Sequence, residues 1–182
     1  MIRVLEEGRS DETARETLLD AAFGHDERLA KTCERLREDR LPADGLSFVA
    51  RDGGALIGTL RFWHVSAGPG CPALMLGPLA VDAAYRSEGI GRQLMHVGLA
   101  QAEMLGHAAV LLVGDAPYYE RFGFRTDPVA KLWLPGLYAR ERFLGLELKA
   151  GALAKAAGLV NPTGNLAPKR SLETLSLAAF AA

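Results

Sequence analysis

The sequence has 182 residues, of which 49% are hydrophobic and 24% are charged, and its formal net charge is -1. This length and balance are typical of one globular domain and exclude a disordered or fibrous chain. A near-neutral chain lacks the surplus of basic residues that neutralises phosphates, so we expect no nucleic-acid partner.

The four histidines and the two cysteines, Cys33 and Cys71, are scattered without the short spacing of a zinc site, so we expect no metal. Isolated cysteines are also typical of a reducing compartment. No run of about 18 apolar residues is present to cross a membrane, and the first residues lack the apolar run of a secretory signal. We therefore predict a cytoplasmic protein without a membrane partner.

The first part of the chain predicts one strand and two helices. Residues 2–6 favour a short strand, and the capping residues 10–13 precede a helix that should run to about residue 23. A second helix is expected over 26–38, because apolar residues recur there at helical spacing with charges on the other face. Its apolar positions are Leu29, Cys33 and Leu36.

A hairpin and a third long strand follow. Residues 46–51 and 55–65 are rich in β-branched and aromatic residues, and Asp52-Gly53-Gly54 between them is a strong hairpin signal. A turn at 66–70 then leads into a strand over 73–81. We expect antiparallel pairing throughout this region.

A helix between two strands comes next. Residues 89–106 have helical periodicity, and residues 109–113 are a short apolar run typical of a buried strand. A strand–helix–strand crossover makes the strands over 73–81 and 109–113 parallel neighbours. The expected apolar stripe of the helix consists of Ile90, Leu94, Val97, Gln101 and Leu105.

The last part of the chain completes the domain. A short helix over 117–122 precedes extended segments over 131–134 and 141–149, which we expect to complete a mixed sheet. Residues 150–182 are rich in Ala, Gly and Leu and show no evident strand. We interpret them as an appendage to a domain over 1–149, packed on that domain or on a partner subunit in a homodimer.

The start of the third helix predicts an anion site. The helix begins within the pair Gly89 and Gly91, and the first turn of a helix offers unpaired amide donors and the positive end of the helix dipole. Glycines let phosphate oxygens approach the backbone closely, while Arg86 and Arg92 add guanidinium groups suited to phosphate.

The strand before this loop predicts an opening in the sheet. Pro78 cannot donate a ladder hydrogen bond and Gly77 weakens the strand, so we expect a bulge there. The backbone groups of residues 79–81 would then be free to pair with an extended ligand that carries amide groups. Tyr118 and Tyr119 follow the neighbouring strand, at the carboxyl end where α/β sheets bind ligands.

In this order and spacing the motifs resemble those of the GCN5-related N-acetyltransferase (GNAT) superfamily, in particular a bacterial group with a Tyr-Tyr-x-Arg-Phe-Gly-Phe segment. The resemblance covers roughly residues 1–149. The pyrophosphate loop pattern Arg/Gln-x-x-Gly-x-Gly/Ala reads Arg86-Ser87-Glu88-Gly89-Ile90-Gly91, and the Tyr-x-x-x-Gly-Phe signature reads Tyr119-Glu120-Arg121-Phe122-Gly123-Phe124. The chain departs from the superfamily after the fifth strand, where Gly114-Asp115 replaces a common Asn.

The resemblance implies an α/β (α+β) fold with a mixed, mostly antiparallel sheet, splayed between two parallel strands and flanked by helices. It also implies direct transfer of an acetyl group from acetyl-CoA to a primary amine of a small molecule or peptide. A non-catalytic sensor or interaction module that binds acyl-CoA is the alternative. The implied cofactor contacts are Leu79, Ala80, Val81, Arg86, Ser87, Glu88, Gly89, Ile90, Gly91 and Arg92.

Two groups are candidates for the chemistry of such a transfer. Tyr119 is the candidate general acid, because a phenol with a pKa of about 10 can protonate a thiolate whose thiol has a pKa of about 8.5 at a small thermodynamic cost. The backbone NH of Leu79 is the candidate oxyanion donor, and one such donor is typically worth about 3 kcal/mol. The general base stays open among Asp26, Glu27, Asp115 and Glu120.

The acceptor is not determined by the sequence. We expect the loops over 23–45 and 125–140 to shape its site. Trp63 and Trp133 either line that site or pack in the core.

Overall fold

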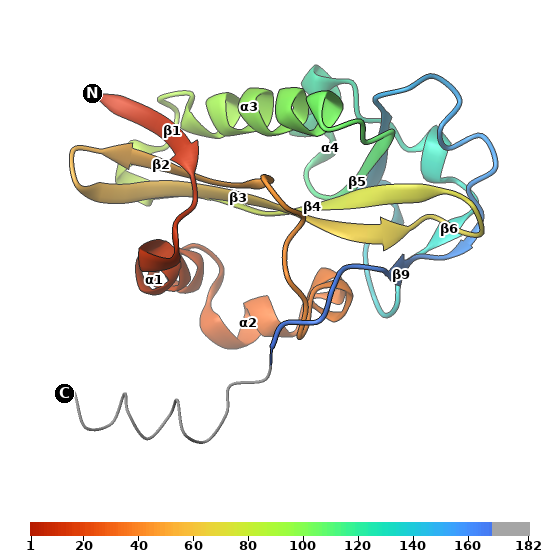
Figure 1. Cartoon of the computed structure of the whole chain (residues 1–182), viewed down its shortest axis with the longest axis horizontal. Coiled ribbons are helices and arrows are strands. Elements are labelled where there is room, and N and C mark those ends of the chain that lie inside the picture. Colours follow the sequence, from red (N-terminus) through yellow and green to blue (C-terminus); the bar gives the residue numbers. More distant parts are fainter. Residues whose placement is uncertain (169–182) are drawn as a thin grey trace.

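The computed structural model of the chain describes residues 1–168 and shows a central sheet with helices on both faces (Figure 1). The sheet contains β1 (Ile2–Glu6), β2 (Ser47–Asp52), β3 (Ala55–Ser66), β4 (Pro72–Val81), β5 (Ala109–Val113), β7 (Phe143–Glu147) and β9 (Asn161–Pro162). The strand order is β1-β2-β3-β4-β5-β7, with β9 paired to β3. Neighbouring strands are antiparallel except β4 and β5, so the expected mixed α/β fold is confirmed.

Helices cover the two faces of the sheet unequally. The long helix α3 (Ile90–Met104) lies on one face, while α1 (Glu12–Phe23) and α2 (His25–Leu29) lie on the other (Figure 1). A short helix, α4 (Ala116–Tyr119), follows β5 and continues as a 3-10 turn, η4 (Glu120–Phe122). Within residues 1–168 no helix is both long and apolar enough to span a bilayer.

The alternation of side chains along β3 divides the core into two layers. Leu60 and Phe62 point to the α3 side, while Trp63 and Val65 join the cluster on the opposite side. All four side chains are buried. Because β3 is apolar on both faces, its central place in the sheet is what the composition of 55–65 requires.

The crossover around α3 has the predicted topology. The strands β4 and β5 are parallel and pair at Leu74–Val110 and Met75–Leu111. The hairpin of β2 and β3 is also confirmed, with its turn at Gly53.

The helix predicted over 26–38 is wrong. The chain forms the short helix α2, which ends at Leu29, and then a separate 3-10 turn, η2 (Thr32–Leu36). Leu29 is half exposed, whereas Leu36 is fully buried. The segment is held by contacts with distant parts of the chain, such as the bond from the Thr32 hydroxyl to the carbonyl of Leu137, and not by a continuous apolar stripe.

The predicted stripe of α3 is partly wrong. Ile90 and Leu94 are buried as expected, but Val97 and Leu105 are exposed. The buried face continues instead through Gly98, where an added Cβ would lie 2.7 Å from the ring of Phe62. Glycine therefore occupies the position at which the helix approaches the sheet most closely.

The prediction for the end of the chain also needs correction. The strand β6 (Leu132–Trp133) is not part of the central sheet, because it pairs in parallel with β8 (Gly158–Leu159). Residues 150–168 do contain strands, and β9 covers the edge of β3 at Val65 and Ser66, where β3 extends past β2. Residues 169–182 of the predicted appendage lie outside the described residues.

Candidate active site

The sheet parts at a bulge in β4. Leu76 is opposite Phe62 and Leu79 is opposite Leu60, so Gly77 and Pro78 together face a single residue of β3, as predicted. Their peptide bond is cis, and the indole NH of Trp63 donates to the Gly77 carbonyl at 2.6 Å. Pairing between β4 and β5 ends at Met75, so the two strands are unpaired beyond this point.

The register shows which backbone groups of β4 face the opening. Asp82 donates its amide to the carbonyl of Ile57 on β3 at 2.8 Å. Because antiparallel pairs alternate along a ladder, the backbone of Ala80 also faces β3, while the backbones of Leu79 and Val81 face the side of β5. The side chain of Ala80 is buried against residues of α1. Because their backbone groups face the opening, Leu79 and Val81 are the candidates to pair with an extended ligand.

The glycine loop at the start of α3 has the backbone of a tight turn. Ser87 and Gly89 both have positive φ angles, 70° and 82°. The first backbone hydrogen bond into α3 runs from the amide of Gln93 to the carbonyl of Gly89 at 3.0 Å. The amides before Gln93 therefore lack a helical acceptor, which is the state that an anion ligand would satisfy.

Two side chains lie close to this loop. The guanidinium of Arg92 lies 3.6 Å from the position that an added Cβ on Gly89 would take. The hydroxyl of Tyr118 lies 2.9 Å from the position of an added Cβ on Gly91. A larger residue at 91 would therefore collide with Tyr118. Arg86, Ser87, Glu88 and Arg92 are exposed, and Ile90 is buried beneath the turn.

A cavity of about 470 Å³ lies where β4 and β5 part. The bulge and Leu79 form one wall, and the end of β5 with Gly114 and Tyr119 forms another. The segment from α2 to η2 and the residues 137–142 also line it. These two segments fall within or beside the loops that were expected to shape the acceptor site.

Tyr119 contacts the cavity and rests on Gly114. An added Cβ on Gly114 would lie 2.1 Å from the ring of Tyr119, so only glycine permits this packing. Burial, with a smaller contribution from Tyr118, raises the pKa of Tyr119 above its ordinary value. The phenol therefore stays protonated near neutral pH, but giving up its proton costs more than the sequence argument assumed.

Comparison with known proteins agrees with this geometry. The family described as "Acetyltransferase (GNAT) domain" matches residues 43–126. A crystal structure of the GNAT family N-acetyltransferase YhbS from Escherichia coli, in complex with CoA, is 34% identical with a TM-score of 0.73, covering 90% of this chain and 89% of that one. The chain belongs to the GNAT family.

Two further relatives extend the comparison. A GNAT family acetyltransferase from Brucella melitensis in complex with acetyl-CoA is 28% identical, with a TM-score of 0.61 over 92% of this chain and 95% of that one. The uncharacterized N-acetyltransferase YjhQ of Escherichia coli is 34% identical over 57% of this chain and 58% of its own length. The curated sequence of YhbS is 39% identical over 60% of this chain, which spans 65% of that relative's length.

The GNAT match contains the bulge, the loop and both tyrosines, since all lie between residues 43 and 126. It does not contain the segment from α2 to η2 or residues 137–142. The family model therefore covers the cofactor side of the cavity, and the opposite side is formed by residues outside the range 43–126.

The candidate bases are not brought together. Of the four, only Asp115 lines the cavity; Asp26, Glu27 and Glu120 are exposed and outside its lining. Trp63 is buried in the core and Trp133 is exposed on β6, and neither lines this cavity. Within residues 1–168 no three His, Cys, Asp or Glu side chains gather to hold a metal ion.

Sequence reasoning missed several residues of the site. The sequence suggests no contact between Tyr118 and the glycine loop, yet the Tyr118 hydroxyl lies against Gly91. Lys31 and Arg142 were not singled out, although both line the cavity. No local motif marks them, because each reaches the cavity through the fold of a distant segment.

Proposed function

We propose that this GNAT protein transfers the acetyl group of acetyl-CoA to a primary amine. The opening between β4 and β5, with the glycine loop at one end and Tyr119 on its wall, is the observation that carries the proposal. The complexes of two similar GNAT proteins with CoA and acetyl-CoA support the choice of acetyl donor.

The cofactor would lie along the open edge of β4. The backbone groups of Leu79 and Val81 would pair with its amide-bearing arm, as an added strand pairs with a sheet. Its diphosphate would bind at the loop Ser87 to Gly91, with Arg86 and Arg92 supplying positive charge.

In the reaction the amine nitrogen attacks the thioester carbon, and the carbon–sulfur bond then breaks. The backbone amide of Leu79 would stabilise the oxyanion, and Tyr119 would donate its proton to the leaving sulfur. The nitrogen must lose a proton first, and Asp115, which lines the cavity, would accept it directly or through water. After the attack the nitrogen loses a second proton, which returns to the Tyr119 phenolate directly or through water, while Asp115 passes its proton to solvent. No covalent intermediate on the protein is needed.

Thiol release from acetyl-CoA with a panel of amines tests the activity, and cofactor titration separates binding from chemistry. We expect Tyr119→Phe to lower turnover about 100-fold with cofactor affinity retained, since an acid typically contributes that much. Arg86→Ala and Gly89→Val should weaken cofactor binding instead. Arg125→Ala is the matched control, because Arg125 is exposed and pairs only with Asp127 among the described residues.

The outcomes distinguish the candidate functions. Stabilisation by acetyl-CoA without thiol release for any amine would favour the binding module over the enzyme. If acetyl-CoA does not bind at all, both are wrong. Equal losses of affinity in Tyr119→Phe and Arg86→Ala would contradict the division of roles.

A further inference from the structure

The cavity carries a surplus of positive charge on the side that the GNAT match does not cover. Its cationic side chains are Arg28, Lys31, Arg37 and Arg142. Asp115 is the one carboxylate among the described residues that line it. An ordinary pocket for a simple cationic amine would be expected to have the opposite balance.

Two of the four cations are neutralised by their own partners. Arg28 is buried and pairs with Glu16 at 2.8 Å and with Asp20 at 2.7 Å. The Nε of Arg37 donates to Glu34 at 2.6 Å. Arg28 thus links α2 to α1, and Arg37 is paired within its own turn, so both arginines already have an anionic partner.

Lys31 and Arg142 have no such partner. No carboxylate among residues 1–168 lies within 4.0 Å of either side chain's nitrogens. The Nζ of Lys31 sits 4.0 Å from the centre of the Phe23 ring, and the Nε of Arg142 donates to the carbonyl of Gly114 at 3.2 Å. Arg142 therefore keeps its two terminal nitrogens for a ligand.

The two free cations act on one another. Burial lowers the pKa of Lys31, and the charges of Arg37 and Arg142 lower it further. The pKa of Lys31 is lowered on balance although the charge of Glu27 opposes this, so positive charge predominates around Lys31. Both side chains are partly open to solvent, and an anion bound between them would offset their mutual repulsion.

The cofactor diphosphate is not that anion. Its candidate site is the loop at the start of α3, whereas Lys31 follows α2 on the opposite face of the sheet (Figure 1). Two separate positive sites fit two separate anionic groups, one on the cofactor and one on the acceptor.

We propose, on the basis of the acetyl transfer above, that the acceptor is a small amine that itself carries a carboxylate or phosphate group. Lys31 and Arg142 hold the anionic group, and the amine end is directed toward Asp115 and the thioester. A cavity of about 470 Å³ that must also admit the end of the cofactor fits a small molecule better than a folded protein segment.

Matched amine pairs test the proposal. β-Alanine is compared with β-alaninamide, and phosphoethanolamine with ethanolamine, by thiol release from acetyl-CoA. A charge-assisted hydrogen bond is worth enough for us to expect kcat/KM to be about 10-fold higher for the anionic member of at least one pair. The two pairs separate carboxylate from phosphate recognition.

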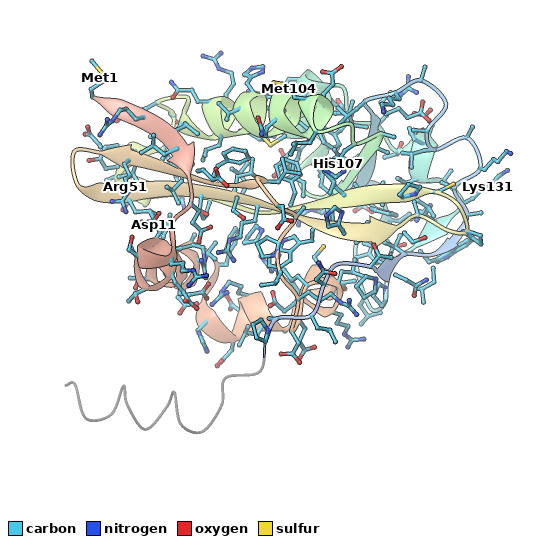
Figure 2. All side chains as sticks on the ribbon, viewed as in Figure 1. Met1, Asp11, Arg51, Met104, His107 and Lys131 are labelled. Atoms are coloured by element: carbon cyan, nitrogen blue, oxygen red, sulfur yellow. The ribbon has the colours of Figure 1, made fainter. Side chains whose placement is uncertain are left out.

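Variants show whether the preference comes from the two cations. Lys31→Met should lower kcat/KM for the anionic member of a pair much more than for its neutral partner and so remove most of the preference, and Arg142→Lys should keep part of it. Lys131→Met is the control, because Lys131 is exposed at the far end of the molecule (Figure 2). Equal kcat/KM within both pairs, or an equal loss for both members in Lys31→Met, would overturn the proposal.

A binding measurement keeps this test separate from the test of acetyl transfer. CoA-loaded protein is heated with each of the four amines. If an anionic amine stabilises the protein and this stabilisation is lost in Lys31→Met, the anion site is supported. If no thiol is released in the same experiments, the proposed acetyl transfer fails while the anion site stands. Absence of both stabilisation and turnover preference refutes the anion site itself.

Discussion

Two glycines show how a missing side chain positions a ring. Gly114 leaves room for the ring of Tyr119 in the cavity wall, and Gly98 leaves room for Phe62 in the core. An added Cβ would lie 2.1 Å from the ring of Tyr119 in the first case and 2.7 Å from that of Phe62 in the second. Replacing glycine by alanine therefore tests the position of the Tyr119 ring at residue 114 and the packing of the core at residue 98.

We expect Gly114→Ala to displace Tyr119 and lower turnover strongly with cofactor affinity retained. Gly98→Ala should destabilise the fold by about 2 kcal/mol, as overpacking typically does, without changing kcat below the unfolding midpoint. Steady-state kinetics and urea unfolding of both variants check this. Normal turnover in a folded Gly114→Ala protein would show that the position of Tyr119 is not important for the reaction.

At the scale of elements, ionic contacts bind the helices of one face to the sheet. Asp11, just before α1, pairs with Arg51 on β2, and Figure 2 shows both residues at the same end of the molecule. Glu7 pairs with Arg61 on β3 and with Arg15 on α1. These contacts position α1, and through it the segment that carries Lys31.

Arg140 makes the most side-chain hydrogen bonds in the loop from β6 to β7. Arg140 donates to the carbonyls of Leu132 at 2.5 Å, Ala130 at 2.7 Å and Val129 at 2.8 Å. This arrangement fixes the segment that carries Tyr138 and Arg142 into the cavity.

Arg140→Ala should cost about 2 kcal/mol of stability, because several charge-assisted hydrogen bonds to backbone are lost together. Arg140→Lys should recover only part, since an ammonium lacks the planar fork of a guanidinium. Chemical denaturation gives both values, with the exposed Arg125→Ala as control. A change no larger than that of the control would mean that the bonds of Arg140 do not hold the loop.

At the scale of the whole molecule, the segment after residue 149 contributes to the core. Leu153, Ala156 and Val160 are buried in the same cluster as Leu111 and Phe143. The boundary expected at residue 149 therefore does not coincide with a gap in packing.

A chain that ends at residue 149 should be much less stable than the full chain. Burying a Leu or Val side chain contributes about 1.5–3 kcal/mol each, a large share of a typical domain's 5–15 kcal/mol. Leu153→Ala with Val160→Ala tests the same contacts at full length, and Leu166→Ala is the exposed control. An unchanged unfolding midpoint of the shortened chain would show that residues 1–149 fold independently.

The sequence by itself determined the features that depend on local chemistry. Proline and glycine in one strand predict the bulge at Gly77 and Pro78, and the apolar runs with their turn signals predict the hairpin and the parallel pair. The order of the loop and tyrosine motifs then indicated the family. Each of these signals lies within a short stretch of chain.

Only the tertiary structure shows which residues line the side of the cavity opposite the candidate cofactor site. The segment predicted as one helix over 26–38 is divided into α2 and η2, and the Thr32 hydroxyl of η2 donates to the carbonyl of the distant residue Leu137. Lys31 and Arg142 line one cavity although 111 positions separate them in the sequence. Contacts between remote segments leave no periodicity in the residues that make them. The candidate acceptor site therefore could not be predicted from the sequence, since its charge is assembled by folding and not by any local motif.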